Sequence, residues 1–263
     1  MQIAKLLVII VCCTCFIFCC QGQKNNVQKM KTFGLIGGTS WHSTAEYYSY
    51  INQMVNDTFQ NNTNPPLIIY NLNQNYIHQL QTRNRWDSIA LTLIEAANQL
   101  QRAGAEAILF CANTPYKVYE EVKAKITMPI LHIVDATGMA IKEKGLHKVG
   151  LLGTIFTMEE IFYRERLKSK FNIDMIVPEN GADRLELHRI VQKELSLGII
   201  KSETKKYILR QIKLMQQRGA EAIILGSTEF PLIIKNGDIS MPLFNTTYLH
   251  SLMAVDYILG HPK

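Results

Sequence analysis

Small hydroxyl and amide side chains gather in four short segments of this sequence, each directly after an apolar run. The segments are Gly37-Gly-Thr-Ser-Trp41, Ala112-Asn-Thr114, Gly153-Thr154 and Ser227-Thr-Glu229. Together they offer hydroxyls, an amide and backbone N–H groups freed by glycine. These groups suit a ligand that carries a carboxylate.

The four segments fall at equivalent places in an internal repeat. Arg102-Ala-Gly-Ala-Glu-Ala-Ile-Leu109 recurs as Gln217-Arg-Gly-Ala-Glu-Ala-Ile-Ile224, an offset of 115 residues. Upstream, Gly34 corresponds to Gly150 with an offset of 116, and downstream Met128-Pro corresponds to Met241-Pro with an offset of 113. Three matches in the same order at nearly the same spacing indicate two copies of one structural unit.

Each copy predicts strands that alternate with helices. An apolar strand ends in Gly and Thr, helices follow, and further strands are expected at Ala107–Cys111 and Ala222–Gly226 and after each Met-Pro. Short apolar strands between amphipathic helices indicate parallel sheets that are buried on both faces. The helix before each central strand has a periodic apolar face, made by Ile89, Leu91, Leu93, Ile94, Ala97 and Leu100 in the first copy and by Ile208, Ile212, Leu214 and Met215 in the second.

We therefore expect an α/β fold of two pseudo-symmetric, doubly wound lobes with a ligand cleft between them. The first lobe covers residues 31–131 together with a C-terminal helix in 244–263, and the second covers 132–243. The cleft is expected between the lobes because parallel sheets bind ligands beyond the carboxyl ends of their strands.

The sequence predicts neither a nucleotide cofactor nor a metal. Gly37-Gly38 lacks the G-x-G-x-x-G spacing, and a tight turn between strand and helix explains it. The seven histidines are scattered without metal-ligand spacing, and His132 is expected on a strand as a core or cleft residue. The net charge of +6 is spread along the chain without a basic run interleaved with aromatics, so we expect no nucleic-acid partner.

The first residues predict export. Residues 1–23 have one lysine before the nearly continuous apolar stretch Leu6–Cys20, whose 15 residues suit a secretory signal better than a membrane span of about 20. Residues 24–30 are interpreted as a polar linker. Cys19 or Cys20 offers an alternative lipid attachment site, although the preceding Ile17 and Phe18 are bulky. The expected location is therefore secreted, periplasmic or lipid-anchored at the cell surface, with membrane contact only through a lipid.

Several of these motifs resemble the aspartate/glutamate racemase family. Gly34–Thr44, followed by Tyr47-Tyr48 and Ile51-Asn52, is similar to the family's opening. Cys111–Tyr116 resembles its first signature, usually thiol-Asn-Thr-x-His, and Gly226–Glu229 resembles its second, usually Gly-Cys-Thr-Glu. The similarity extends from about residue 31 to about residue 250. It implies a cofactor-independent racemase with a small amino acid as substrate, and it suggests a homodimer.

The resemblance also implies roles for particular residues. Racemisation needs an acid and a base on opposite faces of a planar intermediate, and donors that hold the substrate carboxylate. Alignment on the two signatures places Ala112 and Ser227 at the two thiol positions, while Tyr116 replaces the expected histidine. The positions that match the family's substrate-binding residues are Thr39, Ser40, Asn113, Thr114, Thr228 and Glu229.

Ser227 and Cys111 are the catalytic candidates that remain. Alanine has no exchangeable proton, and a serine hydroxyl is a far weaker acid than a thiol, whose pKa is about 8.5. Ser227 can act as an acid or base where a neighbour such as Glu229 activates it. Cys111 can act only where the strand ends before it and the turn rotates it toward the cleft, since adjacent strand residues point to opposite faces. Otherwise it is a small buried hydrophobe.

The sequence thus predicts an amino-acid racemase that transfers protons at Cα with two groups and without pyridoxal phosphate. The alternative is an exported relative that binds an amino acid without turning it over. It is favoured by the substitutions at Ala112 and Ser227 beside retained Asn113, Thr114 and Thr228. A third reading is a decarboxylase or cis–trans isomerase that uses one cysteine, and it requires Cys111 to face the cleft.

Overall fold

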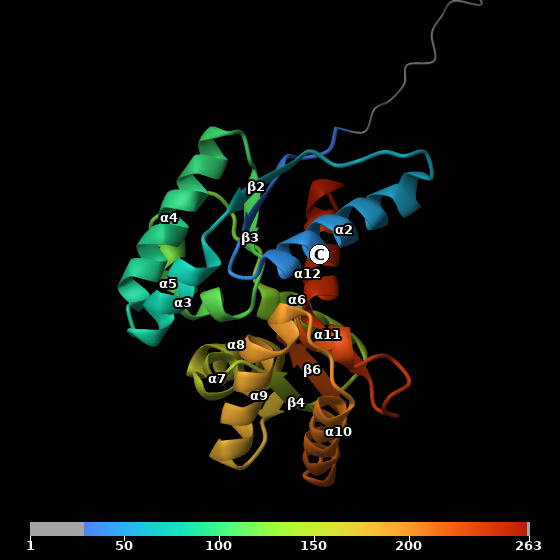
Figure 1. Ribbon diagram of the computed structural model, residues 1–263. Coiled ribbons are helices and arrows are strands. Elements are labelled where there is room, and N and C mark those ends of the chain that lie inside the picture. The colour runs from blue at the N-terminus through green and yellow to red at the C-terminus, as the bar shows by residue number, and fades with distance from the viewer. Residues whose placement is uncertain (1–28, 262–263) are drawn as a thin grey trace, which may run out of the picture.

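Two parallel sheets organise the molecule (Figure 1) in a computed structural model that describes residues 29–261. The expected signal segment therefore lies outside the described residues. The first sheet has the order β2-β1-β3, with strands β1 (Phe33–Gly37), β2 (Leu67–Asn71) and β3 (Ala107–Phe110). The second has the order β5-β4-β6-β7, with strands β4 (Lys148–Gly153), β5 (Asp174–Ile176), β6 (Ala222–Gly226) and β7 (Leu243–Asn245). The predicted α/β class with parallel sheets is confirmed.

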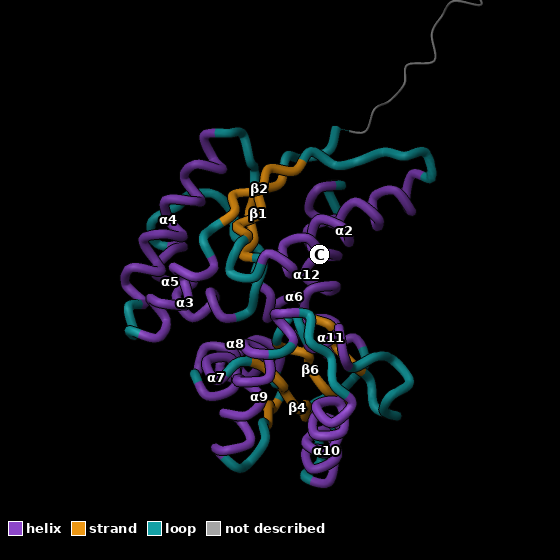
Figure 2. The backbone as a smooth tube through the Cα atoms, viewed as in Figure 1, coloured by secondary structure: helices purple, strands orange, loops and turns teal. Residues whose placement is uncertain are grey.

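Helices connect the strands within each lobe (Figure 2). Around the first sheet these are α2 (Trp41–Phe59), α3 (Gln74–Thr82), α4 (Trp86–Arg102), the 3₁₀ turn η1 (Thr114–Val118) and α5 (Tyr119–Lys123). The chain continues through α6 (Ile133–Glu143), α7 (Ile155–Glu159), α8 (Ile161–Phe171), α9 (Gly181–Lys193), η2 (Leu195–Leu197), α10 (Ser202–Gln217), α11 (Phe230–Ile233) and α12 (Thr246–Ile258). No helix in this described part of the chain is long and apolar enough to cross a bilayer.

The first sheet separates two apolar clusters. Ile108 and Phe110 of β3 pack with α4, whereas Leu109 and the following Cys111 pack with α2 and α12. Alternate residues of a strand point to opposite faces, so both faces of this sheet are covered. Figure 1 shows α4 on one side of the sheet and α2 with α12 on the other.

The structure corrects several details of the sequence prediction. Leu91 and Leu214 are 66% and 45% exposed. Other apolar residues of each helix form its buried face, and these two leucines lie outside that face. After Met128-Pro129 the chain makes a single parallel bridge between Ile130 and Ile108, not a strand. His132 consequently lies outside any strand and caps α6, where its Nδ1 accepts a hydrogen bond from the Val134 N–H at 3.1 Å.

Three further differences concern strand positions. The strand predicted through Cys111 ends at Phe110. The second sheet extends past residue 243, because β7 ends at Asn245. The outer strands β2 and β5 were not predicted. Both are short and lie at sheet edges, where they are only partly buried.

Candidate functional site

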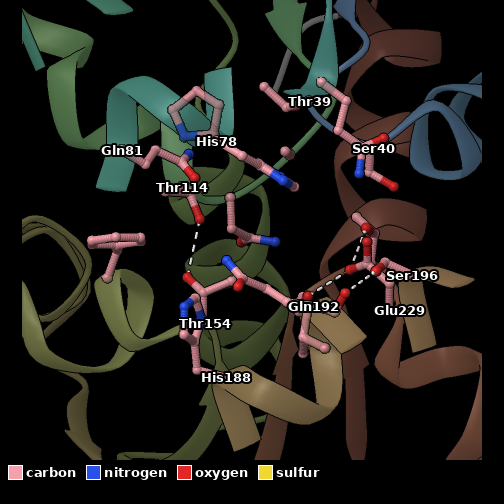
Figure 3. Close-up of a pocket in the computed structure, with 18 of the residues that line it drawn as sticks. Thr39, Ser40, His78, Gln81, Thr114, Thr154, His188, Gln192, Ser196 and Glu229 are labelled. Carbon is pink, nitrogen blue, oxygen red and sulfur yellow. Dashed lines mark hydrogen bonds between the residues drawn. The ribbon is translucent and has the colours of Figure 1, made fainter. Parts of the chain in front are cut away.

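A cavity lies between the lobes at the carboxyl ends of the central strands, where the polar segments were expected to meet (Figure 3). Seven of the eight predicted site residues line it, namely Thr39, Ser40, Asn113, Thr114, Ser227, Thr228 and Glu229. Ala112, at the first thiol position, lines it as well. Cys111 is the eighth predicted residue and does not line this cavity.

The turn from β1 into α2 forms one wall. Gly38 has φ +84, and its N–H donates to Thr44 Oγ1 at 2.9 Å, which tightens the turn. Ser40 caps α2 by accepting a hydrogen bond from the Ser43 N–H at 3.4 Å. The hydroxyl of Thr39 is buried and has no hydrogen-bond partner. A helix N-terminus beside a free hydroxyl favours an anionic ligand group.

A hydrogen-bonded serine and carboxylate form the opposite wall, directly after β6. Ser227 Oγ donates to Glu229 Oε2 at 2.6 Å, and Thr228 Oγ1 donates to the same oxygen at 3.0 Å. All three side chains are buried. Glu229 therefore holds the Ser227 hydroxyl in a fixed direction and can receive its proton.

Glu46, a second carboxylate of the first lobe, is influenced by the charge of Glu229 but does not itself line the cavity. Burial, together with the negative charge of Glu229, raises the pKa of Glu46 on α2 to about 7, and only Lys235 opposes the shift. Glu46 Oε2 is buried without a hydrogen-bond partner. Sequence reasoning missed Glu46, because it lies within the regular pattern of α2 and no motif marks it. The Glu46 carboxyl can hold a proton near neutral pH.

Asn113 presents a free acceptor to the cavity. Thr246 Oγ1 donates to the Leu225 carbonyl at 2.9 Å, so the same hydroxyl must accept the hydrogen bond from Asn113 Nδ2 at 3.0 Å. This fixes the orientation of the Asn113 amide and leaves its buried Oδ1 without a partner. Nearby, Thr114 Oγ1 and Thr154 Oγ1 lie 3.1 Å apart and connect the two lobes across the cavity.

Two histidines that the sequence analysis treated as scattered also line the cavity. His78 lies on α3 and His188 on α9, and each helix follows the outer strand of its own sheet. Their separation is 188 − 78 = 110 residues, close to the repeat offsets of 113–116, and this spacing could have revealed the pair. The cavity lining contains no lysine or arginine.

Burial lowers the pKa of both imidazoles. For His78 the carboxylate of Glu229 and a hydrogen bond to the Thr39 backbone oppose this effect, whereas Lys193 adds to it. For His188 the neighbouring His78 lowers the pKa further. His188 Nδ1 also accepts a hydrogen bond from the Ile155 N–H at 3.4 Å. Both rings are consequently neutral at pH 7.

The catalytic role considered for Cys111 does not fit its position. The strand does end before Cys111, but the alternation of side chains continues through it, and its thiol is fully buried in the cluster with Phe33, Leu35 and Tyr47. Burial raises the pKa of this thiol far above its ordinary value. The decarboxylase or isomerase reading required a cleft-facing cysteine and therefore loses its basis.

Tyr116 is likewise directed away from the cavity. Its hydroxyl donates to the Leu131 carbonyl at 2.7 Å and accepts a hydrogen bond from the Phe110 N–H at 3.2 Å. It therefore does not replace the acid–base function of a histidine. Within residues 29–261, no group of three or more His, Cys, Asp or Glu side chains is arranged to hold a metal ion.

Comparisons with known proteins agree with this architecture. The family model "Asp/Glu/Hydantoin racemase" matches residues 36–254. A crystal structure of an assigned Asp/Glu racemase from Yersinia pestis is 43% identical with a TM-score of 0.82, covering 88% of this chain and 100% of that one. An aspartate racemase homologue from Pyrococcus horikoshii OT3 is 38% identical with a TM-score of 0.75, again covering 88% and 100%.

Curated relatives match a shorter part of the chain. A glutamate racemase from Streptococcus suis (strain 05ZYH33) is 28% identical over 141 residues, which is 53% of this chain and 51% of that protein. The chain thus matches about half the length of the curated relatives. The aspartate racemase of Picrophilus torridus has a TM-score of 0.67 at 19% identity and supports the fold alone.

Proposed function

The chain belongs to the Asp/Glu/Hydantoin racemase family, and we propose that it racemises an amino acid held between its lobes without pyridoxal phosphate. The observation that carries this proposal is the 2.6 Å hydrogen bond from Ser227 Oγ to Glu229 Oε2 at the wall of the interlobe cavity. It supplies a proton-transfer group on the second lobe, at the position where the family's signature places a thiol.

The free polar atoms of the cavity suggest how the substrate is oriented. The N-terminus of α2 and the unpartnered Thr39 hydroxyl suit the α-carboxylate. The unpartnered Asn113 Oδ1 is an acceptor, and with the Glu229 carboxylate it suits the ammonium group. In this arrangement Asn113 holds the ammonium, although the family resemblance implies that it holds the carboxylate.

An acidic or other small amino acid is the proposed substrate. The names of the relatives, glutamate racemase and aspartate racemase, support an acidic one. The cavity lining, by contrast, offers no lysine or arginine for a second carboxylate. Aspartate, glutamate and their neutral amides are therefore the first substrates to compare.

Proton transfer on the second lobe would pass through the hydroxyl. Ser227 Oγ accepts the α-proton as the Cα–H bond breaks, and its own proton moves to Glu229. The negative charge left on the substrate is spread into its carboxylate, where the donors at the α2 N-terminus stabilise it. In the reverse direction, protonated Glu229 returns its proton to Cα through Ser227.

Binding without turnover is the second candidate function. The observation that favours it is Ala112, whose methyl group lines the cavity at the first thiol position and has no exchangeable proton. This candidate keeps the same ligand and the same cavity, so a test of turnover separates it from racemisation.

Exchange of the α-hydrogen for deuterium tests the proposal. The purified protein would be incubated in D₂O with the L and D forms of aspartate, glutamate, asparagine and glutamine, and proton NMR would follow the α-hydrogen. We expect exchange with at least one amino acid. In Ser227→Ala and Glu229→Gln, the rate of exchange at the substrate face that meets Ser227 should fall roughly 10²- to 10⁴-fold. Cys111→Ala is the control and should retain the wild-type rate, because the thiol lies outside the cavity.

Absence of exchange with every amino acid, together with ligand-induced shifts in protein spectra, would reject racemisation and support binding without turnover. If Ser227→Ala exchanges the α-hydrogen of both enantiomers at the wild-type rate, the serine and carboxylate pair is not the proton-transfer group.

We also propose that the protein is exported and forms a homodimer. Residues 1–23, with their apolar stretch, support export, and the mature N-terminus of the protein recovered from its native cell would test it. The exposed aromatic side chains Trp41, Tyr48 and Tyr248 on α2 and α12 support a homodimer. Light scattering during size-exclusion chromatography would measure the mass in solution.

A further inference from the structure

The first lobe lacks an acid–base group at the signature position, but it contributes one other titratable side chain to the cavity. Its lining residues are Thr39, Ser40, Gln74, His78, Gln81, Ala112, Asn113, Thr114 and Pro115. Among these, His78 alone carries a group that exchanges a proton near neutral pH. Hydroxyl and amide side chains cannot accept an α-proton without a partner that ionises them.

From this placement we infer that His78 is the acid–base group of the first lobe, acting on the face of the substrate opposite Ser227. The inference rests on the proposed racemase function. Figure 3 shows His78 and Glu229 on opposite sides of the cavity, with the labelled Thr114 and Thr154 on the same side as His78. The two groups belong to different lobes, as racemisation from two faces requires.

The surroundings of His78 prepare one ring nitrogen as a base. The Thr39 backbone acts against the lowering of the His78 pKa, and the neutral ring keeps one nitrogen with a lone pair. Since burial keeps the ring neutral at pH 7, this lone pair is available to accept a proton. The charged and titratable groups around the ring are Glu229, Lys193 and His188, and the Glu229 carboxylate stabilises the imidazolium that forms.

The proton count closes over one turnover. The reacting form carries one proton more than neutral His78 with ionised Glu229, and this proton is held by Glu229 in one direction and by His78 in the other. When Glu229 holds it, His78 removes the α-proton, the Cα–H electrons pass into the substrate carboxylate, and Ser227 delivers the Glu229 proton to the other face. The products are imidazolium, Glu229 carboxylate and the opposite enantiomer. The reverse reaction starts from imidazolium and ionised Glu229, so the same two groups serve both enantiomers and no oxidant or reductant takes part.

This assignment predicts that each enantiomer loses exchange in a different variant. The α-hydrogen of one enantiomer faces His78, and that of the other faces Ser227. In His78→Gln we expect exchange of the first enantiomer to fall at least about 10²-fold, with the second reduced less than about threefold. Ser227→Ala should show the opposite selectivity. His147→Gln changes an exposed histidine away from the cavity and is expected to match the wild type.

Calorimetric titration of the substrate into each variant would confirm that binding survives, so a misfolded variant is recognised. If wild-type protein exchanges both enantiomers and His78→Gln still exchanges both, or loses both equally with binding intact, the assignment of His78 is wrong while the racemase proposal stands. Exchange of a single enantiomer by the wild-type protein that persists in His78→Gln would also overturn it, because the first lobe would then lack a base. Absence of any wild-type exchange contradicts the proposed function itself.

Discussion

At the scale of single residues, a buried histidine fastens the last helix to the first lobe. His250 of α12 is fully buried, and its Nε2 lies 3.0 Å from the Leu131 carbonyl, so that nitrogen must carry the proton. Its Nδ1 then accepts a hydrogen bond from the Tyr47 hydroxyl of α2 at 2.8 Å. Burial lowers the pKa of His250 to about 3, against the opposing effect of the Leu131 carbonyl. The ring is therefore a neutral structural element.

The lowered pKa of His250 predicts a loss of stability in acid. A histidine in the unfolded chain has a pKa near 6.5. Below that pH the unfolded state therefore binds a proton that the folded state does not bind. Its contribution is complete above pH 6.5 and declines as the pH falls toward about 3. Between pH 7.5 and 5 this group alone removes about 2 kcal/mol from the free energy of unfolding.

Urea unfolding at both pH values in wild type and His250→Gln would measure this effect, since glutamine keeps hydrogen-bonding capacity but does not titrate. The buried His132 adds a pH dependence to both proteins, so the difference between them isolates His250. An equal pH dependence in the two proteins would contradict the assignment.

At the scale of elements, the central strands and their following turns could be predicted from sequence, and this was sufficient to locate most of the site. Thr39, Asn113 and Ser227 come within three residues of the ends of buried apolar strands, and parallel pairing brings the strand ends of each sheet to one edge. His78 and Glu46 lie on helix surfaces instead, where a side chain's partner is set by the packing of whole elements. The amphipathic pattern of a helix gives its buried face but not what that face meets.

The turn between β1 and α2 illustrates how closely elements approach at the site. Gly38 has φ +84, and a Cβ there would lie 2.1 Å from the Leu72 carbonyl oxygen. Gly104 has φ +98 but open space around it. We expect Gly104→Ala to cost about 1–2 kcal/mol from backbone strain alone, and Gly38→Ala to cost about 4 kcal/mol or prevent folding.

Thermal and urea unfolding of the two alanine variants would separate the common strain from the steric clash at Gly38. Equal destabilisation would show that Leu72 yields to the added methyl group. Where Gly38→Ala folds, weaker substrate binding is also expected, since the turn holds Thr39 and Ser40 at the cavity wall.

At the scale of the whole molecule, a small set of contacts beside the cavity joins the lobes. Thr114 meets Thr154, and Lys117 of η1 forms a 2.6 Å ion pair with Glu160 of the second lobe. The Lys117 ammonium also lies 4.1 Å from the centre of the Trp86 ring, and Trp86 contacts Phe156 edge to face. Since Phe156 and Thr114 line the cavity, these contacts set how closely the lobes approach a ligand.

The Lys117–Glu160 pair is therefore expected to affect binding more than folding. Lys117→Met keeps the aliphatic stem over Trp86 but removes the charge, and we expect the Kd of the substrate to rise about two- to fivefold. Lys205→Met is the matched control, because Lys205 forms a 2.7 Å pair with Asp238 within the second lobe and should leave Kd unchanged. Calorimetric titration at low and high salt measures the Kd of both variants.

High salt should weaken wild-type binding toward that of Lys117→Met, because screening acts on the same ion pair. Equal Kd values for the two variants would show that the ion pair does not control the approach of the lobes.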